Sequence, residues 1–477
     1  MVWFAPLLPE IILAVGGLVL MMLAAFTGRR GAGMVGWLAI ALLMAASVAL
    51  IGAPSHAGPL FEGMVSADLF ASFGKAIIFP SAAVAIIASH GWFERDNEHP
   101  AEYSVLIVFA AVGMAVMVSA TNLMSLYVGL ELNSLAGYVL ASYQRRDERS
   151  AEAGLKYFVL GALASGILLY GISLLYGFTG TLSFNGVAAA FGREAPSLGM
   201  LFGLVFVLAG LAFKASAVPF HMWTPDVYEG APTPVTTFFA SAPKVAAVLM
   251  ATRFCVEGLG PATDAWRQIV IFAALASIFL GAIAAYGQTN IKRLLAYSSI
   301  NNVGFAMVGL AAGGAQGASA VLFYMAVYVV MTIGAFLCVL WMRDAEGNPV
   351  ESIASLSGLA QTRPALAGAF AIFMFSLAGI PPLFGFWPKL LVFTAALQAG
   401  YVALAVAGFI GAVIGAYYYL KIVKVMYMDE PAQPYARVHH PLQGALIFLT
   451  AVLVSPLGYL LIGPLGSWTA QAAGSLF

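Results

Sequence analysis

Long apolar runs follow one another along almost the whole chain. Each is about as long as the roughly 20 residues that a helix needs to cross a bilayer. The candidate spans cover residues 4–26, 33–52, 68–90, 103–120, 122–142, 152–177, 199–228, 233–256, 266–287, 292–311, 317–342, 365–400, 402–427 and 441–463. The sequence therefore predicts an all-α polytopic membrane protein with about 14 transmembrane helices.

Charged residues are scarce, which excludes other classes of protein. Only 9% of the 477 residues are charged and 62% are hydrophobic, whereas an ordinary soluble domain carries about 25% charged residues. Disordered chains need low hydrophobicity, and a net charge of zero disfavours nucleic acid as a partner. The first span has no basic segment before it and no cleavage site after it, so we expect a retained helix rather than a signal peptide.

Basic residues in the predicted loops are unevenly distributed. Loops after odd-numbered spans hold Arg29, Arg30, Arg95, Arg145, Arg146, Arg149, Lys292, Arg293, Arg343, Arg363, Lys421, Lys424 and Arg437, whereas loops after even-numbered spans hold only Arg193, Arg253 and Arg267. Cytoplasmic loops carry the excess of Lys and Arg. We therefore expect both termini on the opposite, periplasmic side. The connections are short, and the chain contains no GxxxxGK[ST] motif, so no nucleotide-binding domain is expected.

Spans 7 and 12 are longer than one straight span, and prolines interrupt both. Pro219 and Pro225 lie six residues apart in span 7, as do Pro382 and Pro388 in span 12, where Pro381 also occurs. Each proline removes a helical hydrogen bond, and paired broken helices in two halves of a chain indicate internal repeats. Ordinary proline kinks are the alternative interpretation.

The spacing of these breaks predicts two inverted five-helix repeats, spans 4–8 and spans 9–13, in which spans 7 and 12 are discontinuous. The corresponding regions are an N-terminal three-helix segment (1–100), a first repeat (101–260), a second repeat (261–430) and a C-terminal helix (431–477).

Four ionisable residues lie deep inside predicted spans. Glu131 is near the middle of span 5, Lys214 precedes the break in span 7, Lys244 is central in span 8, and Lys389 follows Pro388 in span 12. A charge at the bilayer centre costs roughly 2.5–3.5 kcal/mol, and such residues usually mark an ion or proton path. The alternatives are a structural ion pair for Glu131 and an interfacial position for Lys214.

Three further residues are weaker candidates. Lys156 is only about one turn into span 6, so its amine can also reach the interface. His221 lies in the break of span 7 and titrates near neutral pH, although a structural histidine is also plausible. Tyr297 and its polar neighbours in span 10 either carry a water chain or join helices.

No redox centre is expected in this chain. Its two cysteines, Cys255 and Cys338, lie in apolar runs and cannot supply the four ligands of an iron–sulfur cluster. Only His221 lies deep enough to act as a haem ligand. We expect no cofactor and no metal bound by the chain itself.

Several motifs resemble the antiporter-like subunits of respiratory complex I, the NADH–quinone oxidoreductase. The segment VPFHMWTPDVYEGAPTPVT at 218–236 is similar to their signature, which related cation/proton antiporters share. APKVAA around Lys244, EAGLKYF at the start of span 6 and IKRLLAYSSINNVGF at 291–305 are similar to subunit N and to its mitochondrial relative, subunit 2. The resemblance covers roughly residues 100–430.

The resemblance implies a proton-translocating subunit and assigns roles to the candidate residues. It implies that Glu131 and Lys214 form an ion pair, that Lys244 is the central lysine and that Lys389 lies at the exit toward the periplasm. Lys156, His221 and Tyr297 match further functional positions. The implied partners are the other membrane-arm subunits and the peripheral arm, which holds FMN, iron–sulfur clusters and the quinone site, in a bacterial inner membrane rather than a mitochondrial one.

Three alternatives remain open on the sequence alone. A subunit of a multi-subunit sodium/proton antiporter shares the motif around His221. A passive spacer in the membrane arm retains its lysines only as ion-pair partners. A stand-alone solute carrier needs polar substrate-binding side chains at the breaks, which are mostly apolar and aromatic here.

Overall fold

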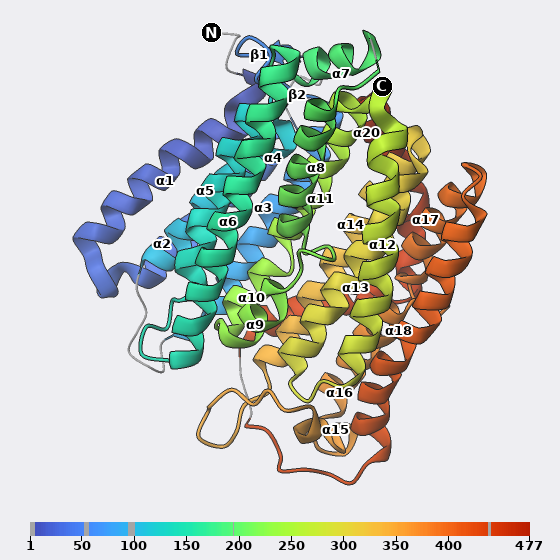
Figure 1. Cartoon of the computed structure of the whole chain (residues 1–477). Helices are drawn as coiled ribbons and strands as arrows, with labels where there is room; N and C mark the ends of the chain where they lie inside the picture. The colour runs from blue at the N-terminus through green and yellow to red at the C-terminus, as the bar shows by residue number, and fades with distance from the viewer. Residues whose placement is uncertain (1–4, 52–56, 94–100, 194, 437–439) are drawn as a thin grey trace.

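The computed structural model describes residues 5–51, 57–93, 101–193, 195–436 and 440–477, and it is helical apart from one short hairpin (Figure 1). Arg95 and Arg437, counted above among the loop charges, lie outside the described residues.

The N-terminal part up to the first break comprises the 3-10 turn η1 (Ala5–Leu7), α1 (Leu8–Thr27), η2 (Gly28–Gly31), α2 (Ala32–Ala49), the hairpin of β1 (Ala57–Leu60) and β2 (Val65–Ala67), α3 (Leu69–Ser89), α4 (Glu102–Ser119), α5 (Leu123–Ala141), α6 (Glu148–Thr179), α7 (Phe184–Arg193) and α8 (Leu198–Ala215). The middle part comprises α9 (Trp223–Gly230), α10 (Thr233–Phe239), α11 (Ala242–Arg253), the π-helical turn η3 (Phe254–Gly258), η4 (Gly260–Ala262), α12 (Thr263–Tyr286), α13 (Ile291–Ala312) and α14 (Gly314–Leu340). The last part comprises η5 (Ile353–Leu356), α15 (Leu359–Thr362), α16 (Pro364–Ala378), α17 (Phe386–Gln398), α18 (Val402–Met428), α19 (Pro441–Val454), η6 (Pro456–Leu461) and α20 (Ile462–Gly474).

The prediction of an all-helical polytopic membrane protein is confirmed. Within the described residues, 11 helices are long and apolar enough to cross a membrane, or up to 12 if the pair α19 and Pro456–Gly474, bent by 66°, counts as one span. That number treats Ala5–Ala49 as a single run and leaves out the shorter apolar helix α16. The expected 14 spans therefore remain a prediction.

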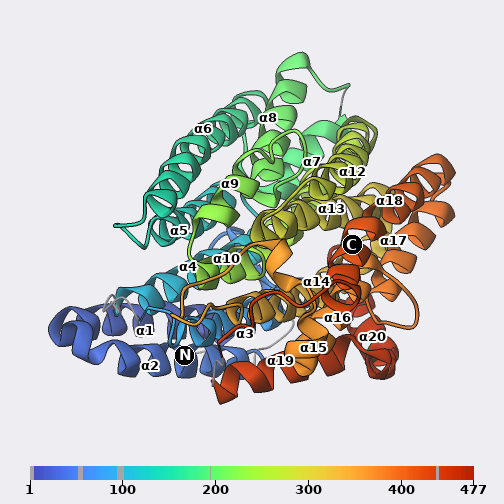
Figure 2. The ribbon, with the colours of Figure 1, turned by 90° about the horizontal axis from the view of Figure 1, so that it is seen from below.

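Burial separates inner helices from outer ones. In an apolar 18-residue stretch of each of α13 and α14, 89% of the residues are buried, whereas only 22% are buried in the corresponding stretch of the run that contains α1 and α2. Seen from below, α14 lies near the centre and α1 and α2 lie at the edge (Figure 2). The exposed residues of the outer helices are largely apolar, as a lipid-facing surface requires, because lipid offers no partners to polar groups.

Two helices are broken, with matching geometry. Between α8 and α9, Ser216 has a φ of 64°; between α16 and α17, Gly379 has a φ of 80°. The amides of Ala217 and Ile380 then bond back to carbonyls five residues earlier, at 2.8 and 3.1 Å. Each of these hydrogen-bonding residues of the first break has a counterpart in the second break, always the same number of residues further along the chain. The chain therefore leaves and re-enters the helix in the same way in both breaks.

Side chains satisfy backbone groups that the breaks release. The amide of Val218 donates to Ser277 Oγ at 2.9 Å in the first break, and the amide of Gly385 donates to Ser376 Oγ at 3.0 Å in the second. Gly385 is required there, because an added Cβ would lie 2.0 Å from the carbonyl oxygen of Ser376. Backbone polar groups at membrane depth must be satisfied within the protein, so both breaks are built into the fold.

A third interruption was not expected from the sequence. The predicted span 233–256 divides into α10 and α11 at Ala240 and Ser241, immediately before Pro243 and Lys244. Helix α11 then ends in the π-helical turn η3. The central lysine therefore lies in the first turn of a helix rather than in the middle of one.

Candidate functional site

Lys214 is held by one face of α5. Its Nζ donates to Ser134 Oγ at 2.7 Å and to Tyr138 Oη at 3.3 Å. Glu131 lies one turn before Ser134 on the same face, because residues three and four apart are neighbours on a helix. No ion pair within 4.0 Å joins Glu131 to Lys214 in this structure, and the buried Glu131 Oε1 has no hydrogen-bond partner among the described residues. The direct pair implied by the resemblance is therefore open here, since two hydroxyls hold the ammonium instead.

Lys244 lies at the first break. It is almost completely buried, and its Nζ donates to the carbonyl oxygen of Ala215 at 3.2 Å and to the hydroxyl of Ser216. The same ammonium lies over the rings of Trp223 and Tyr228, at 5.3 and 5.7 Å from their centroids. Carbonyls at a helix C-terminus carry partial negative charge, so the end of α8 favours a cation at this position.

Lys214 and Lys244 both line one small cavity, to which α4, α5, α6, α8, α9, α10 and α11 contribute residues. Its volume is about 10 Å³, and the lining includes both lysines, Asn133 and Trp223. A cavity needs roughly 10–15 Å³ to hold one water molecule. The two lysines therefore share a space about the size of a single water.

Lys389 occupies the corresponding position at the second break. Its Nζ donates to the carbonyl oxygens of Leu377 and Ala378, at 2.8 and 2.9 Å, and lies 4.7 Å from the centroid of the Phe305 ring. Each break therefore has a buried lysine that donates to the end of its first half-helix, to one carbonyl at the first break and to two at the second. At the first break the lysine comes from the neighbouring α11; at the second it comes from the second half of the same broken helix.

Helix α13 packs against α9 on one side and α17 on the other, and it carries a row of polar groups between the two breaks. Tyr328 Oη donates to Ser299 Oγ at 2.9 Å, and Tyr324 Oη donates to Asn302 Oδ1 at 2.7 Å. Tyr419 contacts both Asn302 and Ser298. Tyr297 is only half-buried, and the buried hydroxyls and amides lie on the neighbouring positions rather than at Tyr297 itself.

His221 lies inside the first break and is half-buried. Its Nδ1 is enclosed without a hydrogen-bond partner in the part of the chain described. His221 is not among the described residues that line the cavity shared by Lys214 and Lys244. Pro219 and Pro225 flank it, as Pro381, Pro382 and Pro388 flank or lie in the second break.

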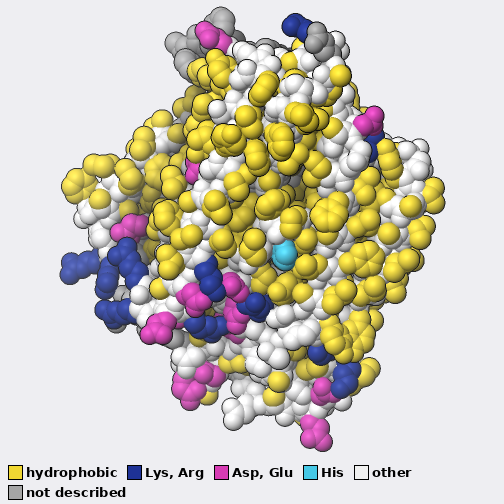
Figure 3. All heavy atoms as spheres, viewed as in Figure 1, with side chains coloured by type: hydrophobic (Ala, Val, Ile, Leu, Met, Phe, Trp, Pro, Cys, Tyr) yellow, Lys and Arg dark blue, Asp and Glu magenta, His cyan; other side chains and the backbone are white. Residues whose placement is uncertain are grey.

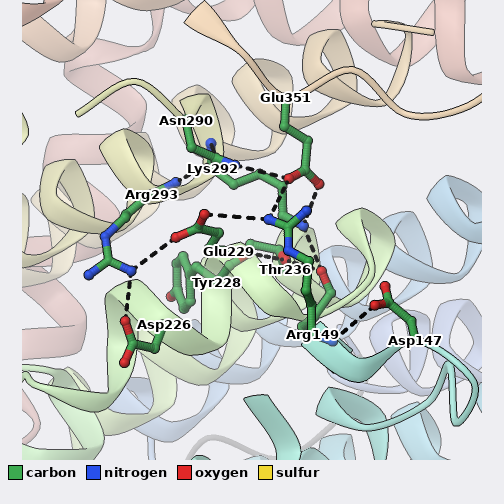
Figure 4. A network of polar contacts seen from close by, with 11 residues as sticks. Asp147, Arg149, Asp226, Tyr228, Glu229, Thr236, Asn290, Lys292, Arg293 and Glu351 are labelled. Carbon is green, nitrogen blue, oxygen red and sulfur yellow. Dashed lines mark hydrogen bonds and ion pairs between the residues drawn. The ribbon is translucent and has the colours of Figure 1, made fainter. Parts of the chain in front are cut away.

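Lys156 belongs to a different arrangement, an ionic cluster where α6, α9 and α13 meet the segment before η5. Figure 4 shows the part of this cluster around Arg149, Arg293 and Glu351. Its Nζ pairs with Asp226 and Glu152 at 2.8 and 2.7 Å, and its side chain is 41% exposed. Four cations and four anions make up this cluster, counted from its ion pairs: Arg149, Lys156, Lys292 and Arg293 with Glu152, Asp226, Glu229 and Glu351. The interfacial alternative for Lys156 is therefore the one that its surroundings favour.

The cluster fixes α9, the short second half of the broken helix. Arg293 pairs with both Asp226 and Glu229 on α9, at 2.7 and 2.9 Å, and Arg149 reaches Glu229 at 3.4 Å. Lys292, 2% exposed, bridges the last turn of α9 and the loop, through the carbonyl oxygen of Ala231 and Glu351 Oε1. The half-helix is thus tied at its end to α6, to α13 and to the loop.

Glu351 lies in the loop outside the spans, and it is mostly buried. Burial alone would raise its pKa, but the adjacent ammonium of Lys292, the amide of Asn290 and the guanidinium of Arg149 together hold that pKa below its usual range. The carboxylate therefore stays ionised at neutral pH, and the cluster remains closed.

Within the described residues, no group of three or more His, Cys, Asp and Glu is arranged to hold a metal ion. Cys255 and Cys338 are both buried and free. The described part of the chain thus presents buried cations, hydroxyls and amides as its chemistry.

Comparison with known proteins assigns the family. The family profile described as "NADH:quinone oxidoreductase/Mrp antiporter, TM" matches residues 120–415. The NADH-quinone oxidoreductase subunit N of Rhizorhabdus wittichii is 62% identical over 98% of this chain and 98% of its own length, and that of Sphingopyxis alaskensis is 57% identical with the same coverage. The chain belongs to the subunit N family of NADH-quinone oxidoreductase. As a subunit N it has the other subunits of that complex as its partners.

Solved structures agree with this assignment. A chain of respiratory complex I from Thermus thermophilus with bound aureothin is 31% identical, with a TM-score of 0.82 over 96% of this subunit N and 99% of that chain. A chain of the Mrp complex from Dietzia sp. is 22% identical, covers 98% and 97% of the two chains and has a TM-score of 0.84. The second likeness shows a shared antiporter-like fold only.

Sequence reasoning missed two groups of residues in this subunit N. One is Ser216, which contacts Lys244; its position between Lys214 and Pro219 is a usable signal. The ionic cluster was also missed, because Arg149, Lys292 and Arg293 were interpreted only as loop charges. Their partners lie far away in sequence, and only the folded chain brings them together.

Proposed function

We propose that this subunit N translocates protons along a route through Lys214, Lys244 and Lys389, driven by NADH oxidation and quinone reduction in partner subunits. The observation that carries the proposal is the placement of Lys244 and Lys389. Each is a buried amine that donates to the end of the first half-helix of a break at membrane depth. A lysine in such a position costs free energy, so its presence at membrane depth indicates a functional role.

The open contact between Glu131 and Lys214 supports a switch at the start of the route. In one state Glu131 pairs with Lys214; in the other, Ser134 and Tyr138 hold the ammonium, as here. Because Lys214 and Lys244 share one cavity, a charge on the first lysine acts on the second through little solvent. Like charges repel more strongly through protein than through water, so a charge on Lys214 favours release of a proton from Lys244.

The polar row of α13 supports a connection between Lys244 and Lys389. It runs from the Ser299–Tyr328 contact near α9 to the Asn302–Tyr324 contact beside Phe305, whose ring faces Lys389. Hydroxyls both donate and accept hydrogen bonds, so with intervening waters they can pass a proton. In this proposal the half-buried Tyr297 and His221 bind water beside the route. Lys156 holds α9 in place at the entrance of the route.

The topology belongs to the same proposal. The matching breaks support two inverted five-helix repeats, in regions 101–260 and 261–430, between the N-terminal segment 1–100 and the C-terminal region 431–477. Fourteen spans in a bacterial inner membrane would leave both termini periplasmic, with the ionic cluster at the cytoplasmic face. FMN, iron–sulfur clusters and quinone would then be held by partner subunits.

The test replaces Lys244 by Ala in the assembled complex. We expect coupled pumping in membrane vesicles to fall to the background level while peripheral-arm oxidation of NADH with an artificial acceptor stays normal. A wild-type ratio of protons to electrons in this variant would refute the route.

A double variant, Glu131→Gln with Lys214→Met, separates the pump from a passive spacer. The route predicts loss of pumping even though no unpaired charge remains, whereas a spacer predicts intact pumping. Co-purification with iron–sulfur subunits separates the complex from a sodium/proton antiporter, whose assembly would lack them.

A further inference from the structure

A large groove opens between the turn joining α1 to α2 and the ends of α4, α5 and α6. Its volume is about 1040 Å³, above the range of about 300–1000 Å³ that is usual for small-molecule sites. The described residues that line it include two basic ones, Arg29 from the turn and Arg145 from the loop after α5, and one acidic one, Glu102. We call this hollow the basic groove.

The rest of the basic groove is mainly apolar and exposed. Leu155, Phe158 and Val139 line it with exposed fractions of 64%, 51% and 48%. These residues belong to α5 and α6, whose outer faces are apolar. The groove thus combines a basic mouth at one end of the helices with an apolar wall along them.

The two arginines are uncompensated. Both are exposed, and neither forms an ion pair within 4.0 Å with any residue in the described ranges. Among the described residues that line the groove, these two guanidinium groups face the one carboxylate of Glu102. Figure 3 shows basic side chains gathered at the lower left, where the turn between α1 and α2 lies in Figure 1, with apolar surface above them.

We propose that the basic groove binds an anionic phospholipid, with its phosphate between Arg29 and Arg145 and an acyl chain against Leu155 and Phe158. Arginine is the preferred partner of phosphate because its planar guanidinium donates two parallel hydrogen bonds. Basic pockets between transmembrane helices on the cytoplasmic side bind anionic headgroups. A helix from a partner subunit fills an apolar wall equally well, but it leaves two arginines without counter-charge.

The basic groove also reaches the lysine site. Tyr138 lines the groove, and its hydroxyl accepts a hydrogen bond from Lys214. An acyl chain in the groove therefore packs beside the residue that holds Lys214. Lipid binding itself does not depend on proton transfer, so the binding test stands apart from the proposed function.

The experiment uses the whole complex in vesicles that contain a photoreactive phosphatidylglycerol or a phosphatidylcholine with the same photoreactive tail. After illumination, mass spectrometry quantifies lipid adducts on the peptide that contains Leu155 and Phe158. We expect the anionic lipid to label this peptide at least fivefold more than the zwitterionic lipid. The double variant Arg29→Gln, Arg145→Gln should lose that preference, and Arg193→Gln, an exposed arginine outside the groove, should keep it.

Two further variants keep the test decisive. Glu102→Gln removes the one acid among the described lining residues and should increase labelling by the anionic lipid. A gain in labelling cannot be caused by failure of the variant to fold. A photoreactive benzoylphenylalanine at Phe158 should crosslink to lipid. Equal labelling by both lipids, a preference that survives the double substitution, or a crosslink from position 158 to a partner subunit would each overturn the proposal.

Discussion

Ser216 offers the sharpest test of how the first break works. Its side chain stabilises the break through hydrogen bonds, whereas its backbone conformation destabilises it. The hydroxyl contacts Lys244 and accepts a hydrogen bond from Thr224 Oγ1 at 2.6 Å. The backbone has a φ of 64°, a left-handed conformation that costs a non-glycine residue about 1–2 kcal/mol. The substitution Ser216→Gly removes the hydroxyl and relieves the backbone at the same time.

The expected magnitudes follow from those contacts. A hydrogen bond to a charged group contributes about 1.5–3 kcal/mol, which corresponds to roughly a 10- to 150-fold change in an equilibrium or rate. One partner, the carbonyl oxygen of Ala215, remains for the ammonium of Lys244. The relieved strain offsets most of the lost hydrogen bond, so we expect the variant still to assemble, with a stability at most about 2 kcal/mol below that of the wild type, and to pump protons at least about tenfold more slowly.

The assay measures proton uptake by inverted membrane vesicles during NADH oxidation, beside the amount of assembled complex and its melting temperature. Thr224→Val is the matched control, since it removes the other partner of Ser216 and leaves Lys244 untouched. Wild-type pumping by Ser216→Gly would refute a role for the hydroxyl. Failure of Ser216→Gly to assemble, where the control does assemble, would refute the argument from backbone strain.

Three further predictions concern the second break and the ionic cluster. Lys389→Met keeps the buried stem but leaves two carbonyls without a donor, so we expect assembly with pumping reduced to background. The control Lys421→Met, which removes a surface lysine that also bonds a carbonyl, should pump normally. Equal pumping by both variants would contradict the role of Lys389. Gly385→Ala should lower the amount of assembled complex, because overpacking costs about 1–3 kcal/mol or more. The control Gly368→Ala, whose added Cβ meets only one atom at 4.0 Å, should assemble fully. An intact Gly385→Ala complex would show that the break is pliable. Glu351→Gln should lower the melting temperature of the complex by a loss of about 1–3 kcal/mol. Since the pKa of Glu351 is below its usual range, its contribution to stability is complete above about pH 4.3 and is lost only as the pH falls further. The difference in melting temperature from the wild type should therefore be the same at pH 6 and pH 8. A difference that shrinks toward pH 6 would contradict this ionisation.

The family profile and the curated relatives agree with what the apolar runs and the motif around His221 had predicted. Membrane helices are predictable from the sequence because each satisfies its own backbone hydrogen bonds, so a run such as residues 402–427 needs no distant partner to be recognised. The two breaks are predictable for the same reason, since Pro219 and Pro382 prevent helical bonding locally.

The residues that hold the lysines required the tertiary structure. Neither the contact of Ser134 with Lys214 nor that of Ser216 with Lys244 follows from spacing, because each joins residues of different helices. The ionic cluster depends even more on the fold, since Arg149 and Glu351 lie about two hundred positions apart and meet only when the loop packs on α6 and α13.

The sequence by itself determined the membrane class, the broken helices and the few charges at membrane depth, because hydropathy and proline act within a single helix. Only the tertiary structure decided that Glu131 and Lys214 are apart, that Lys214 and Lys244 share one small cavity, and that Lys244 and Lys389 each donate to the end of the first half-helix at a break. Those facts depend on how helices pack, and packing is set by contacts between residues that the sequence keeps far apart.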